Sequence, residues 1–355
     1  MRVVQMIDSL ESGGAERMAV TIANELVGQV SFSGLLSTRI EGNLKSAIDK
    51  EVYYLFLNKS KTFDFKALKK CKHYLIENNV THIHAHGSSY FFAFLIKILL
   101  PKIKLFWHDH HGNRVNSRKS NLIIKFISLF FKGVFTVNQE LESWAKSNLY
   151  CKNVVFLPNF LPSKIVETNH TVLKGREGMR IVCLANLRYP KNHLKLLKAF
   201  NQSKAIHQGW TLHFIGKDNN DEYSNTLKNY IQINNMYEKV FLYGSCTDTN
   251  FILKQADIGI LVSTFEGFPV TLLEYGMANL GVVTTEVGYC STLIINEING
   301  LIVNPNKVNE ISDKLDKIAL DKNFRNDLSS KFNTFVNENY SASKIINLIL
   351  QFYIK

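Results

Sequence analysis

The stretch "ADIGILVSTFEGFPVTLLEYGMA", Ala256 to Ala278, holds the pattern that decides the fold of this chain. Its first third is an almost continuous apolar run, which is typical of a central strand in a parallel sheet. The segment "TFEGF" predicts a loop at the carboxyl end of that strand, and Pro269 suits the first turn of a following helix. Glu266 then lies on the loop, and Glu274 lies about one turn inside the helix.

The same alternation of short apolar runs and longer amphipathic segments continues over most of the chain. Strand-like runs such as "MRVVQMI", "VSFSGLLS" and "VYYLFL" occur early, and "RIVCLANL", "WTLHFIG" and "KVFLYG" occur in the second half. Strands that alternate with helices predict parallel sheets covered by helices on both faces. We therefore expect an α/β fold of two facing Rossmann-like domains, with an interdomain cleft at the carboxyl ends of the strands.

The alternation pauses in the polar stretch "LPNFLPSKIVETNHTVLKGREGM", Leu157 to Met179, which contains two of the six prolines. This composition predicts a linker. We expect a first domain over residues 1–165, a linker over 166–178 and a second domain over 179–338. A C-terminal helix over 339–355 could pack back on the first domain. A chain of 355 residues with 46% apolar side chains can fill two such cores.

Cysteine usage and the N-terminal residues indicate the compartment. The five cysteines form no C-x-x-C pair, so they indicate neither a disulfide framework nor a zinc site. Charged and polar residues appear by position 8, which is too early for the apolar core of a signal peptide. No uncharged apolar run reaches the roughly 18 residues that a spanning helix needs. We expect a cytoplasmic protein, either free or peripheral on the inner face of the cell membrane.

The net charge of +12 lies almost wholly in the first half of the chain. Residues 1–175 carry 23 Lys and Arg against 13 Asp and Glu, whereas the remainder carries 19 against 17. Such asymmetry predicts an anionic partner. No nucleic-acid motif is recognisable, which favours an anionic membrane surface. The stretch "SRKSNLIIKFISLFFKGVF", Ser117 to Phe135, fits a helix lying on lipid, and it fits equally a core helix with a solvated basic face.

Ligands of doubly wound sheets bind beyond the carboxyl ends of the strands, so the residues that follow each strand are the site candidates. After the first strand, Gly13 and Gly14 precede a helix whose free amides could face a phosphate, although a plain tight turn would look the same. This pair is neither a G-x-G-x-x-G fingerprint nor a P-loop, which argues against a dinucleotide enzyme or an NTPase.

Two histidine-rich stretches also follow or form strands in the first half. His82, His84 and His86 in "THIHAHG" alternate and share one face, and His86 at the strand end should be the most accessible to ligand. They could bind a metal, but packing beside the cleft is the favoured interpretation. In "FWHDHHGNR" neighbouring side chains diverge, so one histidine acting by hydrogen bond or proton transfer is favoured over a metal site. The expected acceptor-side residues are His86, His110, His111 and Arg114.

The second half supplies cations and carboxylates. Arg188 and Lys191 lie around the start of a helix, where two positive charges could hold a diphosphate. The helix that follows Glu266 would place Glu274 roughly 7 Å beyond the helix start, so the two carboxylates can reach different parts of one extended ligand. The amides between Gly267 and Leu272 are expected to be free for phosphate. A nucleotide sugar has groups that match these in order: the sugar hydroxyls, the diphosphate and the ribose hydroxyls.

These residues resemble the retaining glycosyltransferases of family 4, which have the GT-B fold of two facing Rossmann-like domains. The motif that carries the resemblance is E-x7-E, here Glu266 to Glu274. Supporting matches extend over nearly the whole chain and include "GGAERMAVTIANEL", "HAHG", "FWHDHHG", "FLPNFLP", "LANLRYPKNHLKLLKAF" and "LHFIGKD". In many relatives an arginine stands at the position of Asn186, so here Arg188 would have to take its place.

The resemblance implies transfer of a sugar from a nucleotide-diphosphate donor to a hydroxyl acceptor with retained anomeric configuration. It implies that Glu266 bonds the donor sugar's hydroxyls, that Glu274 bonds the ribose and that His108 lies at the reacting sugar. The implied catalytic residues are Glu266, His108, Arg188 and Lys191. The implied donor-binding residues are Gly13, Gly14, Arg188, Lys191, Gly216, Glu266, Gly267, Phe268, Pro269, Leu272 and Glu274. No Asp-x-Asp motif occurs, so neither a metal nor another cofactor is expected.

The basic first half suits a saccharide acceptor linked to a lipid, as in bacterial capsule or O-antigen assembly, and no nucleic-acid partner is expected. Other enzymes of the GT-B fold, such as a non-hydrolysing sugar epimerase or a phosphorylase, share this pattern. An inactive glycan-binding partner subunit is a further alternative. Conversion of the donor alone would reveal an epimerase, and a requirement for phosphate would reveal a phosphorylase. Failure to bind nucleotide sugars would indicate the inactive subunit.

Overall fold

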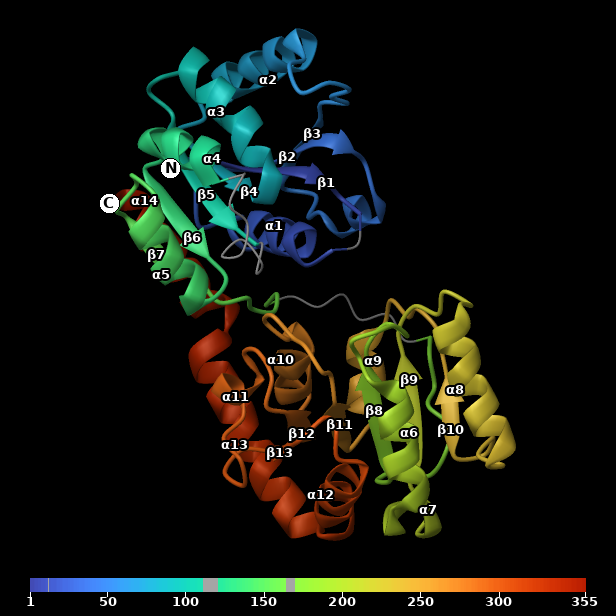
Figure 1. Cartoon of the computed structure of the whole chain (residues 1–355). Coiled ribbons are helices and arrows are strands. Elements are labelled where there is room, and N and C mark those ends of the chain that lie inside the picture. The colour runs from blue at the N-terminus through green and yellow to red at the C-terminus, as the bar shows by residue number, and fades with distance from the viewer. Residues whose placement is uncertain (12, 111–120, 164–169) are drawn as a thin grey trace. The chain divides into compact units, whose positions relative to one another are not determined.

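The computed structural model describes residues 1–11, 13–110, 121–163 and 170–355. The chain divides into two compact units, shown in Figure 1. The first unit consists of Met1–Ser163 together with Ala342–Lys355, and the second consists of Lys164–Ser341. Each unit is built around one parallel sheet, which confirms the predicted α/β fold.

The first unit contains a seven-stranded parallel sheet with the order β3-β2-β1-β4-β5-β6-β7. The strands are β1 (Arg2–Ser9), β2 (Phe32–Ile40), β3 (Tyr53–Phe56), β4 (His82–His86), β5 (Lys104–Asp109), β6 (Gly133–Thr136) and β7 (Val154–Phe156). This is the doubly wound order, and its direction reverses between β1 and β4. Ligands of such sheets bind at that reversal, so the residues after β1 and β4 are well placed for binding.

Helices cover both faces of the first sheet. They are α1 (Gly14–Glu25), α2 (Phe65–Glu77), α3 (Tyr90–Leu99), α4 (Asn121–Ile127), α5 (Gln139–Asn148) and α14 (Ala342–Ile354), with short 3-10 turns η1 (Asn43–Ala47), η2 (Gly87–Ser89) and η4 (Ser128–Phe130). Buried side chains of α1 and α14 share one core with Phe106 and Phe135. Helices α2 to α5 contribute to a second core that includes Trp107. The last helix of the chain therefore belongs to the first unit.

The second unit repeats this plan with six parallel strands in the order β10-β9-β8-β11-β12-β13. They are β8 (Arg180–Leu184), β9 (Thr211–Ile215), β10 (Val240–Leu242), β11 (Ile258–Leu261), β12 (Gly281–Thr285) and β13 (Leu301–Val303). The helices are α6 (His193–Gln202), α7 (Lys204–His207), α8 (Glu222–Ile233), α9 (Thr249–Lys254), α10 (Val270–Met277), α11 (Cys290–Leu293), α12 (Val308–Leu320) and α13 (Lys322–Tyr340). The order reverses between β8 and β11.

Several helices begin where a short polar side chain satisfies a free amide. Asp64 accepts a hydrogen bond from the Ala67 amide at the start of α2, and Asp221 accepts one from the Ser224 amide at the start of α8. Asp321 does the same for α13. Such caps contribute about 1 kcal/mol each and fix the residue at which a helix starts. They help to explain why the alternating pattern of the sequence predicts the elements so directly.

Two segments differ from the expectation or add to it. A continuous helix over Ser117–Phe135 is wrong, because α4 ends at Ile127, the 3-10 turn η4 ends at Phe130 and strand β6 starts at Gly133. Part of the expected linker lies along the second unit: the amides of His170 and Thr171 donate to the Asp248 carboxylate, at 2.9 and 2.6 Å. Within the described ranges, no helix has both the length and the apolar character needed to cross a bilayer.

Candidate functional site

An ion pair joins the carboxyl ends of the two strands at which the second sheet reverses. Lys191 follows β8 and Glu266 follows β11, and these two strands are neighbours in the sheet. Lys191 Nζ lies 2.6 Å from Glu266 Oε1, and the side chains are 20% and 10% exposed. Ser263 Oγ donates a second hydrogen bond to Glu266 Oε1, also at 2.6 Å. The pair is shielded but reachable, at the position where this fold binds ligands.

The two loops that carry this pair are fastened to each other. Asn192, which precedes α6, has a left-handed backbone with φ of 62°. Its side-chain amide donates to the carbonyls of Val262 and Pro305, at 3.0 and 2.8 Å. The Thr264 amide donates to the Pro190 carbonyl at 2.9 Å. Because each loop is hydrogen-bonded to the other, the charges of Lys191 and Glu266 are held in place before any ligand arrives.

Helix α10 begins at Val270, with Pro269 as its N-cap residue, and Glu274 is the fifth residue of the helix. The buried Tyr275 beside Glu274 anchors this helix, since its hydroxyl accepts a hydrogen bond from the Leu184 amide at 2.8 Å. Leu184 is the last residue of β8. The half-buried Glu274 is thus fixed close to the same strand end that leads to Lys191.

The expectation that all amides from Gly267 to Leu272 are free is wrong in part. The Val270 amide donates to the Phe268 carbonyl at 3.1 Å, and the Leu272 amide donates to the Pro269 carbonyl at 3.0 Å. The Leu272 side chain is fully buried. The short turn that Pro269 starts uses these amides internally, so of the expected donor-binding residues Leu272 has mainly a packing role.

A third loop, which follows β12, completes the surroundings of Glu266, and none of its residues was among those expected at the site. Gly288 has φ of 53°, and a Cβ there would lie 1.7 Å from the Glu266 carbonyl oxygen. The Tyr289 amide donates to the Gly267 carbonyl at 3.1 Å, and the Tyr289 ring stacks on Phe268 with 4.9 Å between centroids. A glycine just after a strand was the only sequence signal for this contact.

Arg188 and Gly216, two further expected residues, lie near this site without joining the ion pair. Arg188 is exposed, and its carbonyl accepts a hydrogen bond from the Lys191 amide at 2.9 Å. The structure thus brings Lys191, and not Arg188, to Glu266. Gly216 follows β9, and a Cβ there would lie 2.2 Å from the Ala185 carbonyl oxygen. Glycine is required at this position for the close approach of two backbones.

In the first unit, Gly13 is the N-cap of α1 and Gly14 is its first residue. A Cβ on Gly14 would meet no atom within 4 Å, so the space beside its backbone is open. A Cβ on Gly13 would lie 2.2 Å from Glu16 Oε2. The Glu16 carboxylate therefore lies at the positive end of the helix, and a phosphate that bound there would compete with it.

Four histidines gather at the carboxyl ends of β4 and β5, and we call His84, His86, His108 and His110 the histidine cluster. His86 and His108 are directly paired between the two strands. Ring centroids lie 4.5 Å apart for His84 and His86 and 4.0 Å apart for His108 and His110. The expectation that His86 is accessible is wrong, because it is 0% exposed. Strand pairing buries it, and the half-buried His110 lies nearer the surface.

Hydrogen bonds connect this cluster to the last helix of the chain. His84 Nδ1 lies 2.7 Å from the Tyr353 hydroxyl, which also accepts a hydrogen bond from Gln5 Nε2 at 3.4 Å. Gln5 Oε1 lies 2.8 Å from His86 Nε2, and His86 Nδ1 lies 3.0 Å from His110 Nε2. A buried polar network thus extends from α14 through the sheet to the residue that follows β5.

Burial lowers the pKa of His84, His86 and His108 well below the usual value, so all three are neutral near pH 7. Both ring nitrogens of the buried His108 lack a hydrogen-bond partner among the described residues. A buried polar group of this kind gains stability when a ligand supplies a partner. His108 can therefore accept or donate a hydrogen bond without bringing a charge to the site.

Nitrogen atoms of His84, His86 and His108 lie within 4.8 Å of one another, a grouping that metal-binding histidines also show. Two nitrogens on one tetrahedral zinc lie roughly 3.4 Å apart, given Zn–N bonds of about 2.0–2.1 Å. Both nitrogens of His86 are already within hydrogen-bond distance of Gln5 and His110. The arrangement fits hydrogen bonding better than metal binding. The expected acceptor-side residues His111 and Arg114 lie outside the described residues.

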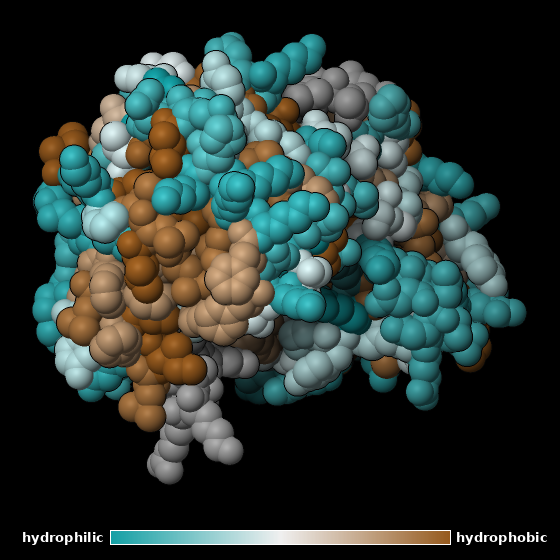
Figure 2. Space-filling view, turned by 90° about the horizontal axis from the view of Figure 1, so that it is seen from above, coloured by the Kyte–Doolittle hydropathy of each residue, from teal (hydrophilic) through white to brown (hydrophobic). Residues whose placement is uncertain are grey.

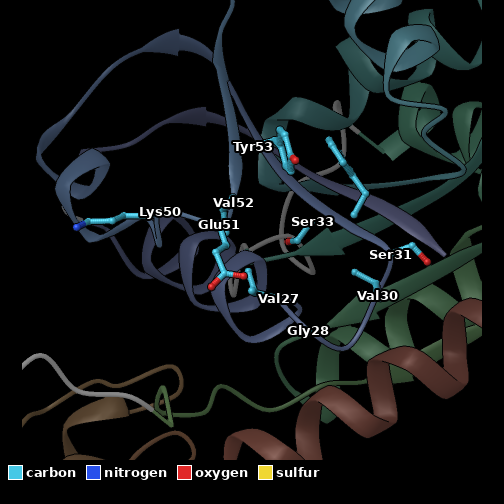
Figure 3. Close-up of a pocket in the computed structure, with 10 residues that line it drawn as sticks. Val27, Gly28, Val30, Ser31, Ser33, Lys50, Glu51, Val52 and Tyr53 are labelled. Atoms are coloured by element: carbon cyan, nitrogen blue, oxygen red, sulfur yellow. The ribbon is translucent and has the colours of Figure 1, made fainter.

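A cavity of about 420 Å³ opens elsewhere on the first unit (Figure 3). Its lining includes Val27 and Gly28 after α1, Ser31 before β2, and Lys50 and Tyr53 at the start of β3. These residues lie at the amino ends of β2 and β3, which is the edge of the sheet opposite to the one that binds ligands in doubly wound folds. We therefore do not assign this cavity to the candidate site.

Comparison with known proteins places the candidate site in a matched domain. Residues 167–333 match the family model for glycosyl transferases group 1. The matched range includes Lys191, Glu266 and Glu274. The chain is 26% identical over 351 residues to the O-antigen biosynthesis glycosyltransferase WbnH of Escherichia coli, with 95% of this chain and 96% of that protein covered. It is 23% identical over 342 residues, 87% of each chain, to the UDP-Gal:alpha-D-GlcNAc-diphosphoundecaprenol alpha-1,3-galactosyltransferase of Escherichia coli.

Solved structures share the fold over nearly the whole chain. A glycosyltransferase from Rickettsia africae superposes with a TM-score of 0.80 at 18% identity, over 99% of this chain and 97% of that one. The Anabaena protein HepE, solved in complex with UDP, superposes with a TM-score of 0.81 at 14% identity, over 99% of each chain. The matched domain, the curated relatives and the shared architecture together show that this chain is a glycosyltransferase with the GT-B fold.

Proposed function

We propose that this chain transfers a sugar from a nucleotide-diphosphate donor to a hydroxyl of a saccharide acceptor, with retention of the anomeric configuration. The observation that carries the proposal is the ion pair of Lys191 and Glu266 at the point where the second sheet reverses. A departing nucleoside diphosphate carries negative charge, and a cation held in place by fixed loops stabilises that charge in the transition state. Lys191 meets this requirement.

The other residues divide the remaining tasks. Glu266 would accept hydrogen bonds from the donor sugar's hydroxyls, and Glu274 would accept them from the ribose. Arg188, which is exposed beside the site, would add positive charge for the diphosphate. The bond between the anomeric carbon and the phosphate oxygen breaks, a bond from that carbon to the acceptor oxygen forms, and the proton of the acceptor hydroxyl passes to the departing diphosphate. Neutral His108 would hydrogen-bond the reacting sugar.

The relatives point to a substrate class. One curated relative is named for O-antigen biosynthesis, another for a diphosphoundecaprenol-linked acceptor and UDP-galactose, and HepE was solved with UDP. We propose a UDP-sugar as donor and a lipid-linked saccharide as acceptor, in the synthesis of a bacterial surface polysaccharide such as O-antigen or capsule. The protein would act in the cytoplasm, peripherally on an anionic membrane surface, without a metal ion.

The test is transfer from a panel of UDP-sugars to a lipid-diphosphate saccharide, measured for the wild type and Glu266→Gln. We expect kcat to fall by about 100-fold or more, because the variant loses the charge that pairs with Lys191 and bonds the donor. Glu222→Gln, an exposed change at the start of α8, is the matched control and should leave kcat unchanged. Equal kcat for Glu266→Gln and the wild type would contradict the assigned site.

Further arms of this experiment separate the other functions of this fold. Epimerisation of the donor without acceptor would indicate an epimerase, and a requirement for inorganic phosphate would indicate a phosphorylase. Failure of the purified chain to bind any nucleotide sugar in a thermal-shift assay would indicate an inactive partner subunit. Activity should persist in EDTA, and a strict requirement for Mg²⁺ or Mn²⁺ would contradict metal independence.

A further inference from the structure

A set of large apolar side chains is exposed on one side of the first unit. We call this set the apolar face, and its members come from the end of α3, from α4 and from η4: Ile98, Leu99, Leu122, Ile123, Phe126, Leu129 and Phe130. Leu122 is 77% exposed and Phe126 is 59% exposed. Figure 2 shows apolar side chains gathered in one broad brown area that hydrophilic residues border. Exposed apolar patches of this kind mark interaction surfaces.

The apolar face continues through a chain of aromatic contacts. Ring centroids lie 6.3 Å apart for Phe126 and Phe130, 4.9 Å for Phe130 and Phe94, and 6.5 Å for Phe94 and Phe91. Phe91 also contacts Phe63, which precedes α2, at 5.7 Å. The contacts make one connected surface over four parts of the sequence, and not a scatter of single exposed residues, which would need no explanation.

Folding of the first unit does not require these outward side chains. Ile124 and Ile127 of α4 are already buried in the core, at 0% and 2% exposed. A helix on the surface of a globular protein normally has polar residues on its outer side. In α4 the outer side instead carries Leu122, Ile123 and Phe126. The helix is therefore apolar on two sides, and among the described residues of the first unit only one of these sides has a partner.

Charge around the apolar face indicates the chemistry of the missing partner. The described residues of this region, 59–110 and 121–132, carry 11 Lys against 3 Asp and Glu, a balance of +8. Of the three acidic residues, Asp109 is buried and Asp64 caps α2. Exposed cations next to the face include Lys102 and Lys132. An anionic partner complements this charge, whereas a second copy of the same surface would be repelled.

The apolar face also extends to the ligand-binding edge of the first sheet. Phe91, one member of the aromatic chain, lines a cavity of about 430 Å³ together with Asp8, Arg39, Lys59 and Ser88. Asp8 and Arg39 lie near the carboxyl ends of β1 and β2, where ligands of this fold bind. A partner that covers the face would therefore lie next to the edge at which the acceptor is expected.

We propose that the apolar face docks on an anionic phospholipid bilayer. Leu122, Ile123 and Phe126 would enter the boundary between headgroups and acyl chains, while the surrounding lysines attract the anionic headgroups. Apolar insertion and electrostatic attraction reinforce each other in this arrangement, because neither alone gives stable binding. The proposal rests on the proposed function in one respect: docking would bring the strand ends of the first unit to a lipid-linked acceptor.

The test measures binding of the full chain to vesicles, without donor or acceptor. We expect co-sedimentation with vesicles of phosphatidylglycerol and phosphatidylcholine in equal parts, weak binding to phosphatidylcholine alone, and weaker binding at high salt. Phe126→Gln should lower vesicle binding about tenfold or more, because the variant lacks the aromatic ring that moves from water into the bilayer on docking. The matched control is Ile233→Gln on α8, which replaces a side chain that is 78% exposed in the second unit. It should bind as the wild type does.

Each other outcome has a definite meaning. Equal vesicle binding by Phe126→Gln and Ile233→Gln, or no binding of the wild type to anionic vesicles, would overturn the proposal. A wild-type dimer in sedimentation experiments that Phe126→Gln converts to a monomer, without vesicle binding, would assign the face to a second copy. Insertion itself is tested with Phe126→Trp, whose fluorescence brominated lipids should quench, whereas Ile233→Trp should stay unquenched.

Failure of this proposal and failure of the proposed function are distinguishable. If docking fails, Phe126→Gln and the wild type should transfer sugar equally to lipid-linked and short-chain acceptors. If docking holds, Phe126→Gln should keep transfer to a short-chain water-soluble acceptor and lose transfer to the lipid-linked one in vesicles. If vesicle binding follows the pattern above while no transfer occurs with any acceptor, docking stands and the assigned reaction does not.

Discussion

The carboxyl ends of the two sheets differ in chemistry although the two sheets share one topology. In the second unit the reversal point carries an ion pair, Lys191 with Glu266, which is partly exposed. In the first unit the ends of β4, one strand of the reversal, and of its neighbour β5 carry His86 and His108, which are buried and neutral near pH 7. The fold therefore fixes where a site can form, and the side chains at the strand ends decide what that site can bind.

The difference follows from what each group costs to bury. An isolated charge is expensive to remove from water, so Lys191 and Glu266 are stable there only as a pair with further hydrogen bonds. A neutral imidazole costs less, and those of His84, His86 and His108 can pack together with Gln5 and Tyr353. The second unit is thus suited to a charged diphosphate, and the first is suited to uncharged hydroxyl groups of sugars.

The strongest test of this comparison is Lys191→Met. The change removes the cation from the proposed leaving group and leaves Glu266 without its ion-pair partner. We expect kcat to fall by about 100-fold to 1000-fold and the melting temperature to fall as well. Transfer kinetics and differential scanning calorimetry would measure the two effects.

The control for this change is Lys195→Met, on α6, where the half-buried Lys195 donates an exposed hydrogen bond from Nζ to Asn306 Oδ1 at 2.6 Å. It should leave kcat within about twofold of the wild type, because exposed contacts of this kind contribute little. If Lys195→Met reduced kcat as much as Lys191→Met, general loss of positive charge would explain the result, and the charged site would lose its special role.

The buried histidines predict a loss of stability in acid. Burial lowers the pKa of His84, His86 and His108, so the unfolded chain takes up protons at about pH 6.5 while the folded chain does not. The free energy of unfolding should therefore be constant above about pH 7 and should fall below about pH 6.5. The fall is about 1.4 kcal/mol per pH unit for each imidazole that stays neutral in the fold.

Urea unfolding at several pH values between 7 and 4 measures this effect. His193 and His213 of the second unit contribute to the same trend, since burial lowers the pKa of each to about 4. His108→Asn should reduce the slope by about one proton, whereas His207→Asn, at an exposed position, should not change it. An unchanged slope in His108→Asn would mean that His108 takes up its proton in the folded chain as it does in the unfolded chain.

A smaller effect is expected at the other carboxylate of the second unit. Glu274→Gln keeps the shape of a half-buried side chain on α10 and removes its charge. We expect the KM for the donor to rise about tenfold with kcat changed less than twofold, because a charge-assisted hydrogen bond to the ribose contributes equally before and during the reaction. Glu266→Gln should instead lower kcat and change the KM for the donor little. A fall in kcat without a change in KM for Glu274→Gln would exchange the two roles.

Sequence reasoning predicted the second unit more fully than the first. The run before Ser263 marks a buried strand and Pro269 marks the helix start, so Glu266 and Glu274 could be placed from a local pattern. What could not be read was the pairing of Glu266 with Lys191, because 75 residues separate them in the chain. The contact of Gly288 with the Glu266 loop also needs the register of β12 beside β11.

In the first unit the pattern located the histidines but not their surroundings. Alternation along β4 placed His84 and His86 on one face, which the structure confirms, since both rings lie in one stack. Their hydrogen-bond partner Tyr353 is 269 residues from His84, and nothing local links the two. The expected exposure of His86 failed for the same reason: neighbouring strands and α14 bury it, and periodicity within one strand does not report what covers a face.

The smallest predicted effect tests whether the hydrogen-bond network of the first unit positions the site or only fills the core. Tyr353→Phe removes the hydroxyl that His84 and Gln5 share and leaves the ring in place. We expect the free energy of unfolding to fall by about 1 kcal/mol. Tyr53→Phe, on a side chain that is 58% exposed, is the matched control and should change it by less than about 0.5 kcal/mol.

Kinetics then separate the two roles of the network. If it holds His110 in place through Gln5 and His86, Tyr353→Phe should raise the KM for the acceptor two- to fivefold and leave donor affinity unchanged, because the contacts proposed for the diphosphate and the ribose lie in the second unit. If the network only fills the core, stability should fall while both constants stay as in the wild type. The second outcome would confine ligand recognition in the first unit to the residues that reach the surface. The buried histidines would then have a structural role, and they would not be the counterpart of the charged pair in the second unit.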